Sequence, residues 1–119
     1  SGRVTGVQTC ALPISDIFFS QNGSSLAAVY KHKGFWDLAV NQTPWQLSAD
    51  QVFFPTMSRD GSVVAVVAEK QGQYQLAVNG RSLASGFSFM ADPVISPDGS
   101  KVMLKGIKNG IYKRQLISL

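Results

Sequence analysis

Ser58-Arg59-Asp60-Gly61, followed by the apolar run Val63–Glu69, carries the main signal for the fold. The tetrapeptide is typical of a tight turn, because an aspartate there accepts hydrogen bonds from its own backbone and glycine suits the last position. The run that follows reads Val-Val-Ala-Val-Val-Ala-Glu, apolar at consecutive positions. A strand with that pattern is covered on both faces, so we expect the central strand of a stacked sheet.

The same turn recurs at a constant interval. It stands as Ser20-Gln21-Asn22-Gly23 and again as Ser96-Pro97-Asp98-Gly99, and the glycines at 23, 61 and 99 are 38 residues apart. Further glycines keep this register at positions 34, 72 and 110, and so do aromatic residues at positions 36, 74 and 112. A fixed period near 40 residues, filled with short strands, is the signature of propeller blades.

Each repeat divides into short strands joined by turns. In the second repeat we expect strands at Val52–Met57, Val63–Glu69, Tyr74–Val78 and Leu83–Phe87. The turns between the last three are Lys70-Gln71-Gly72-Gln73 and Asn79-Gly80, and Asn-Gly is the strongest short hairpin signal known. In the first repeat Gln42 replaces the glycine, at a cost of about 1 kcal/mol in a left-handed conformation. A longer or different turn is therefore an alternative there. We expect the fourth strand of this repeat around Trp45–Leu47.

The sequence thus predicts an all-β fold, a fragment of a β-propeller with about three four-stranded antiparallel blades and a 38-residue repeat. We place the repeats at about 16–53, 54–91 and 92–119. The alternative is a β-sandwich of repeated hairpins. The uniform spacing argues against it, because sandwich loops usually vary in length.

The first fifteen residues look foreign to this pattern. Val4-Thr5-Gly6-Val7-Gln8-Thr9-Cys10-Ala11-Leu12-Pro13-Ile14 resembles the in-frame translation of a common sequencing adapter, and Ser15 fits the next codon. We expect residues 1–15 to be non-native and the natural protein to continue upstream. Cys10, the single cysteine, then carries no functional weight.

Charge and composition favour no nucleic-acid or membrane role. The net charge is +4, with basic residues scattered from Lys31 to Arg114, whereas a nucleic-acid surface needs them clustered with aromatics. The sequence contains no run of about 18 apolar residues, the length at which membrane insertion would be expected.

Catalytic motifs are also missing from the sequence. The nearest approach to a nucleophile elbow, Gly80-Arg81-Ser82-Leu83-Ala84, lacks the second glycine. His32 is the only histidine, and a metal site needs several ligands. We expect no enzyme activity, no cofactor and no metal.

Two groups of residues are candidates for a defined role. The aromatic residues are expected either to pack between blades or to form a recognition surface; they are Trp36, Trp45, Tyr74 and Tyr112. The second group is expected to form turns, and it comprises Asp60, Gly61, Asn79, Gly80, Asp98 and Gly99.

Two resemblances to known families follow from these residues. Ser96–Leu104 resembles the repeats of WD-repeat-like and TolB-type propellers. Leu-Ala-Val-Asn-Gln-Thr-Pro-Trp, residues 38–45, is similar to the Val-Asn-Gly-x-Pro-Trp repeats of the WD-repeat-like accessory subunit of the transmembrane redox complex (Tmc) of sulfate-reducing bacteria. This resemblance covers residues 16–119, although the second repeat has Ser82-Leu83 in place of Pro-Trp.

The resemblance implies a non-catalytic, protein-binding scaffold beside haem and iron–sulfur partners. It implies a cytoplasmic bacterial subunit that associates with the membrane through those partners and binds no cofactor itself. The alternatives are a periplasmic TolB-type propeller and the propeller domain of a serine peptidase whose catalytic domain lies elsewhere.

Overall fold

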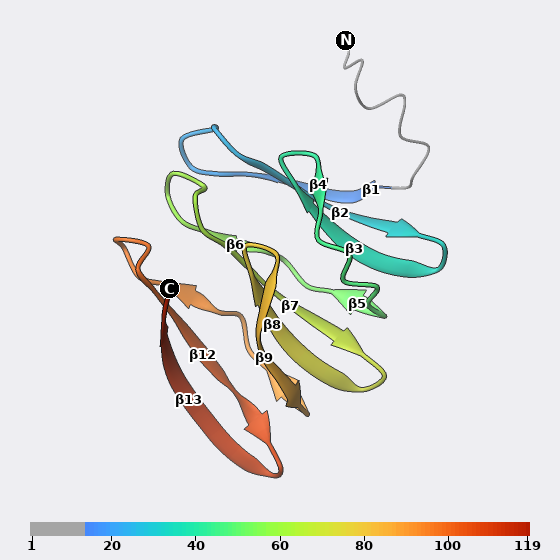
Figure 1. The fold of residues 1–119 in the computed structure, drawn as a ribbon, viewed down its shortest axis with the longest axis vertical. Coiled ribbons are helices and arrows are strands. Elements are labelled where there is room, and N and C mark those ends of the chain that lie inside the picture. The colour runs from blue at the N-terminus through green and yellow to red at the C-terminus, as the bar shows by residue number, and fades with distance from the viewer. Residues whose placement is uncertain (1–13) are drawn as a thin grey trace.

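The structure, a computed structural model, describes residues 14–119 of the chain. Within that range every regular element is a β-strand, so the prediction of an all-β fold is confirmed. Antiparallel pairing links the strands into three sheets of four, five and four strands (Figure 1). No helix that could cross a membrane occurs between residues 14 and 119. Most of the adapter-like segment, with Cys10, lies outside the described residues.

The three sheets follow one another along the chain. The first contains β1 (Ile14–Phe19), β2 (Leu26–His32), β3 (Phe35–Val40) and β4 (Thr43–Pro44). The second contains β5 (Gln51–Val52), β6 (Thr56–Met57), β7 (Val64–Lys70), β8 (Gln73–Val78) and β9 (Arg81–Phe87). The third contains β10 (Phe89–Met90), β11 (Val94–Ile95), β12 (Lys101–Lys108) and β13 (Ile111–Ser118).

The central strand β7 is buried on both faces, as its apolar run predicts. Val64 and Val66 belong to a core cluster shared with the first sheet, where they join Val29 and Leu38. The alternate residue Val67 belongs to a second cluster, shared with the third sheet. Because successive side chains of a strand point to opposite faces, the second sheet packs face to face against both neighbours.

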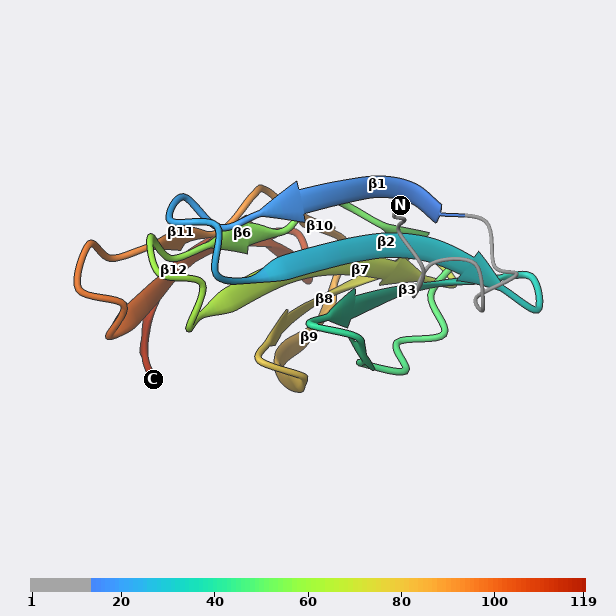
Figure 2. The ribbon, with the colours of Figure 1, turned by 90° about the horizontal axis from the view of Figure 1, so that it is seen from above.

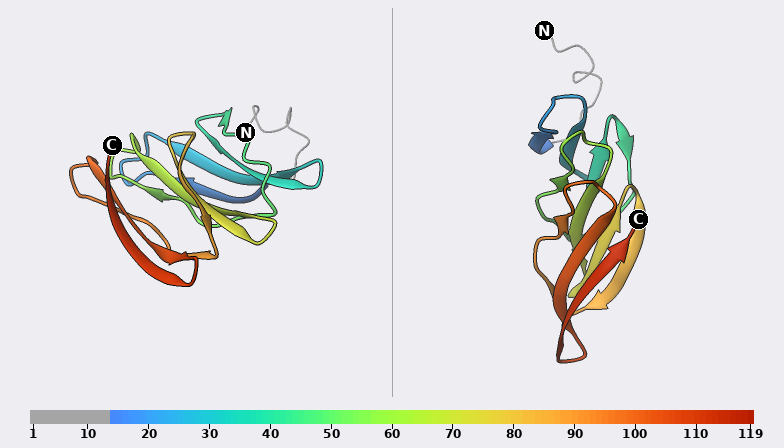
Figure 3. Two further views of the ribbon diagram at one scale, coloured as in Figure 1. Left: turned by 60° about the horizontal axis from the view of Figure 1, so that its bottom comes forward. Right: turned by 90° about the vertical axis from the view of Figure 1, so that its left-hand side faces the viewer.

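This stacking gives the molecule a flat, elongated shape. Its extents are 48 × 34 × 17 Å, and Figure 2 shows how thin it is along the shortest direction. The first sheet lies at one end, the β12–β13 hairpin lies at the other, and the second sheet lies between them (Figure 3). Each end sheet therefore has one face without a neighbouring sheet among the described residues.

The strand predicted at Val52–Met57 is divided in two. Strands β5 and β6 both pair with β7, and the segment Phe53-Phe54-Pro55 separates them. The Phe53 amide still donates to the carbonyl of Val67, at 3.0 Å. Pro55 has no amide hydrogen to give, so the ladder is interrupted next to it.

The first repeat differs from its predicted course in two places. Asn41 and Gln42 form a two-residue turn with φ of 49° and 71°, close to 49° and 82° at Asn79 and Gly80. The longer turn considered for Gln42 is therefore wrong. A short fourth strand follows, as expected, but it is β4 at Thr43–Pro44 and not Trp45–Leu47. In the second repeat, β9 includes the predicted strand Leu83–Phe87 and begins two residues earlier.

The sheets and the predicted repeats are out of phase. The strands of the three sheets run over residues 14–44, 51–87 and 89–118, whereas we set repeat boundaries after residues 53 and 91. Each of those boundaries falls between two short strands that pair with the same central strand, β5 and β6 in one case and β10 and β11 in the other. Strand β1 begins at Ile14, inside the segment expected to be non-native.

Candidate interaction surfaces

The three Ser-x-Asx-Gly turns have the same geometry and lie along one edge of the stack (Figure 1). In each, the glycine amide donates to the serine carbonyl at 2.9 Å. The serine hydroxyl donates to the Asn22, Asp60 or Asp98 side chain, at 2.9, 3.0 and 2.8 Å. These hydrogen bonds join residues of the same turn, so each turn can form without contact with another sheet.

The two aspartates of these turns are held in the ionised form. The backbone amide of Ser100, then its hydroxyl and that of Ser96, lower the pKa of Asp98 to about 2. The amide and hydroxyl of Ser62 lower the pKa of Asp60 below its ordinary value in the same way. A carboxylate that accepts three such hydrogen bonds serves the turn, as the sequence predicts for both residues.

The asparagines of the hairpin turns connect them to the start of the central strand. The Asn79 side chain accepts from the Val64 amide at 2.9 Å and donates to the carbonyl of Ser62 at 3.1 Å. Asn41 accepts from the Leu26 amide at 2.9 Å in the equivalent place. Gly80 is the second residue of its turn and lies next to Trp45. A Cβ atom placed on Gly80 would lie 3.9 Å from the Trp45 ring.

Three of the four candidate aromatic residues pack between sheets. Trp36 and Trp45 are half-buried against the cluster that joins the first and second sheets. Tyr74 packs on the other cluster, and its ring centroid lies 5.7 Å from those of Phe53 and Phe89. Tyr112 differs, because 62% of its surface is exposed.

Asp37 lies in the middle of β3 and is buried. Its carboxylate accepts from the Tyr30 hydroxyl at 3.0 Å and from the amides of Leu38, Gln46 and Leu47 at 2.8, 3.1 and 2.9 Å. These bonds hold the chain where it leaves the sheet after β4, next to Trp45. A charged residue in an apolar strand was the available signal for such a role.

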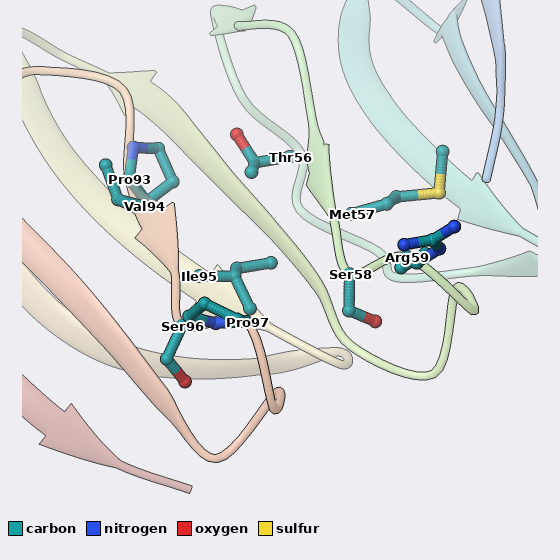
Figure 4. Close-up of a pocket in the computed structure, with 9 residues that line it drawn as sticks. All are labelled: Thr56, Met57, Ser58, Arg59, Pro93, Val94, Ile95, Ser96 and Pro97. Atoms are coloured by element: carbon teal, nitrogen blue, oxygen red, sulfur yellow. The ribbon is translucent and has the colours of Figure 1, made fainter. Parts of the chain in front are cut away.

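A shallow cleft of about 400 Å³ lies between β6 and β11 (Figure 4). Its walls are mainly apolar, and its polar side chains include Ser58, Arg59 and Ser96. No group of three or more His, Cys, Asp or Glu side chains in residues 14–119 is placed to hold a metal ion.

A concentration of positive charge lies in the third sheet, although the basic residues look scattered along the sequence. Five of the eleven basic residues stand in β12 and β13, and this hairpin contains no acidic residue. Lys105 and Arg114 lie directly opposite each other across the two strands. The basic residues are thus less scattered than their positions in the sequence suggested.

The fold places the chain in a general class, that of repeat proteins built from stacked antiparallel sheets. The chain matches no model of a known protein family, and a comparison with curated proteins also gave no match.

Proposed function

We propose that the chain is a non-catalytic scaffold of the β-propeller type, which binds other proteins through the ends of its stack. The observation that carries the proposal is the apolar face of the first sheet, which no other sheet covers among residues 14–119. Ile17 and Phe19 lie on this face and are 53% and 68% exposed. Exposed apolar patches of this kind mark sites where protein surfaces meet.

The repeat indicates what this face is suited to contact. Leu26 and Ala28 lie opposite Phe19 and Ile17 on the same face. One repeat later, the equivalent residues are Val64 and Val66, which the first sheet buries almost completely. The uncovered face therefore has the composition of a face that normally receives another sheet.

Membership of a redox complex rests on the resemblance of residues 38–45 alone. Trp45 of that segment packs against the core, so the Pro-Trp pair supports blade packing rather than partner recognition. Genes for cytochromes and iron–sulfur proteins beside the gene for this chain are the expected finding. Their absence would favour a TolB-type propeller, for which the Ser96-Pro97-Asp98-Gly99 turn is equally suited.

Sedimentation velocity of the full chain over a range of concentrations tests the scaffold proposal. We expect reversible association that grows with concentration, because an apolar sheet face gains free energy when it is covered. Phe19→Glu should reduce this association. Phe54→Glu is the matched control, since Phe54 is 65% exposed but lies in the segment between β5 and β6. A chain that stays monomeric at every concentration would count against the proposal.

A further inference from the structure

The chain contains three Asn-Gly pairs, and each lies in a tight turn. They are Asn22-Gly23, Asn79-Gly80 and Asn109-Gly110. An asparagine in such a pair is chemically labile, because the amide nitrogen of the glycine can attack the carbonyl carbon of the asparagine side chain. Glycine has no Cβ atom to hinder that approach. The surroundings of each pair in the folded chain therefore decide which asparagine reacts.

The first pair is held by hydrogen bonds to the atoms that would react. The Asn22 side-chain oxygen accepts from the amide and the hydroxyl of Ser24, at 3.0 and 2.8 Å. The Gly23 amide donates to the Ser20 carbonyl at 2.9 Å, so the attacking nitrogen is engaged as well. Reaction at this pair would first have to break these bonds.

The second pair is held at both polar atoms of the asparagine side chain. The Asn79 side-chain oxygen accepts from the Val64 amide at 2.9 Å, and its nitrogen donates to the Ser62 carbonyl at 3.1 Å. The backbone amide of Asn79 also donates to the Val64 carbonyl, at 3.0 Å. These partners lie at or just before the start of β7, so the protection of Asn79 needs no neighbouring sheet.

The pair Asn109-Gly110 has the same backbone conformation without these bonds. Its φ angles are 54° and 74°, against 49° and 82° at Asn79 and Gly80. Among residues 14–119, no hydrogen bond joins the Asn109 side chain or the Gly110 amide to another residue. Both residues are exposed, and a Cβ atom placed on Gly110 would meet nothing within 4 Å. This pair therefore lacks the restraints that hold the other two.

The exposure of Asn109-Gly110 follows from its place in the repeat. The equivalent turns, at Lys33-Gly34 and Gln71-Gly72, are also exposed. The second of these belongs to a sheet that is covered on both faces, by the first and the third sheets. All three turns project from the edge of the stack opposite to the Ser-x-Asx-Gly turns (Figure 1). A further sheet against the third one would therefore leave Asn109 accessible.

The charges around the turn favour loss of a proton from the Gly110 amide. In the second sheet the Glu69 carboxylate accepts from the Gly72 amide at 2.7 Å, which opposes loss of that proton. Ile107 takes the place of Glu69 in the third sheet, and a lysine, Lys108, precedes the turn. A nearby cation favours the negatively charged form of an ionising group, whereas a carboxylate disfavours it. The attacking nitrogen of the third pair thus ionises more readily.

We propose that Asn109 is a site of spontaneous deamidation in the folded protein, and that Asn22 and Asn79 are protected from it. The Gly110 amide nitrogen loses its proton to hydroxide and bonds to the side-chain carbonyl carbon of Asn109. The bond from that carbon to the side-chain nitrogen breaks, and the nitrogen takes up a proton from water and leaves as ammonia. Water then opens the succinimide ring at one carbonyl to give aspartate, or at the other to give isoaspartate. The modification adds one negative charge to the turn and does not depend on the scaffold role.

The test incubates the full chain in warm, mildly alkaline heavy-oxygen water and follows tryptic peptides by mass spectrometry. Trypsin places the three asparagines in separate peptides, residues 4–31, 71–81 and 109–113. Asn109 should react about twentyfold faster than Asn79 or more, because each of the two side-chain hydrogen bonds of Asn79 is worth about a fivefold factor when the turn opens. In concentrated urea all three asparagines should react at similar rates, since each then has only its glycine as neighbour.

Two variants at Ile107 test the cause. Ile107→Glu supplies the carboxylate that Glu69 provides in the second sheet, and should slow the reaction of Asn109 about fivefold, the value of one hydrogen bond. Ile107→Lys, the matched control, copies Lys31 of the first sheet and should not slow it. The rate at Asn79 reports in each variant whether the fold is retained. Equal rates at Asn79 and Asn109 in the folded chain, or equal slowing in the two variants, would overturn the inference.

Discussion

Alanine at Gly61 should destabilise the protein far more than alanine at either of the glycines one repeat away. Gly23, Gly61 and Gly99 have φ of 77°, 77° and 75°, so a side chain at any of them meets the same local strain. That strain costs about 1 kcal/mol in the left-handed region. The three positions therefore form a series in which the backbone penalty is constant and only the surroundings differ.

The surroundings of Gly61 leave no room for a Cβ atom. Such an atom would stand 2.5 Å from Cβ and Oγ of Ser25 and 2.9 Å from Cβ of Ser20, both buried residues of the neighbouring sheet. Relief requires the two turns to separate, which would stretch the bond from the Ser24 hydroxyl to the Asp60 carbonyl, now 2.9 Å. Overpacking of this kind costs roughly 1–3 kcal/mol, for a total near 2–4 kcal/mol.

The other two glycines, Gly23 and Gly99, have room for a Cβ atom. A Cβ at Gly99 would lie 3.7 Å from the Val63 side chain, an ordinary contact, and a Cβ at Gly23 would meet nothing within 4 Å. Urea denaturation of the three alanine variants of the full chain measures the difference. Ser25→Gly should restore part of the stability lost in Gly61→Ala, because it removes the closest atoms. Equal losses at all three glycines would refute the close approach of the first two sheets on which the stacking depends.

Three further predictions concern single residues. Gln42→Gly should raise the free energy of unfolding by about 1 kcal/mol, because Gln42 has φ of 71°; an unchanged urea midpoint would contradict this. Asp37→Ala should lower the free energy of unfolding by about 3 kcal/mol, since it leaves the amides of Gln46 and Leu47 without their acceptor. A loss of stability no larger than that of ordinary surface substitutions would argue against this role of Asp37. The pKa of Asp98 is depressed to about 2 in the folded chain, so its stabilising contribution is present above its ordinary pKa of 3.8 and is lost as the pH falls from there through about 2. Melting temperatures between pH 1.5 and 5 should therefore fall less steeply for Asp98→Asn than for the natural chain, and parallel profiles would contradict this.

Local chemistry was sufficient to predict the all-β fold and its turns. The Ser-x-Asx-Gly turns close through hydrogen bonds among residues at most five positions apart, so their residue types are enough to identify them. The same is true of Asn79-Gly80, where both residues need positive φ. The apolar run of β7 likewise indicates that both of its faces are covered, because consecutive strand residues point in opposite directions.

The role of individual side chains depended on the neighbouring sheets. Trp45 is part of the core and Tyr112 is exposed, although the sequence put both in one group. Asp37 is buried because the chain after β4 folds back to give it amide donors. Lys105 and Arg114 meet only through the register of β12 with β13. The amino-acid sequence by itself determined where strands and turns form, because those depend on contacts between near neighbours. Only the tertiary structure decided which faces of the first and third sheets are covered, because that depends on whether another sheet lies against them.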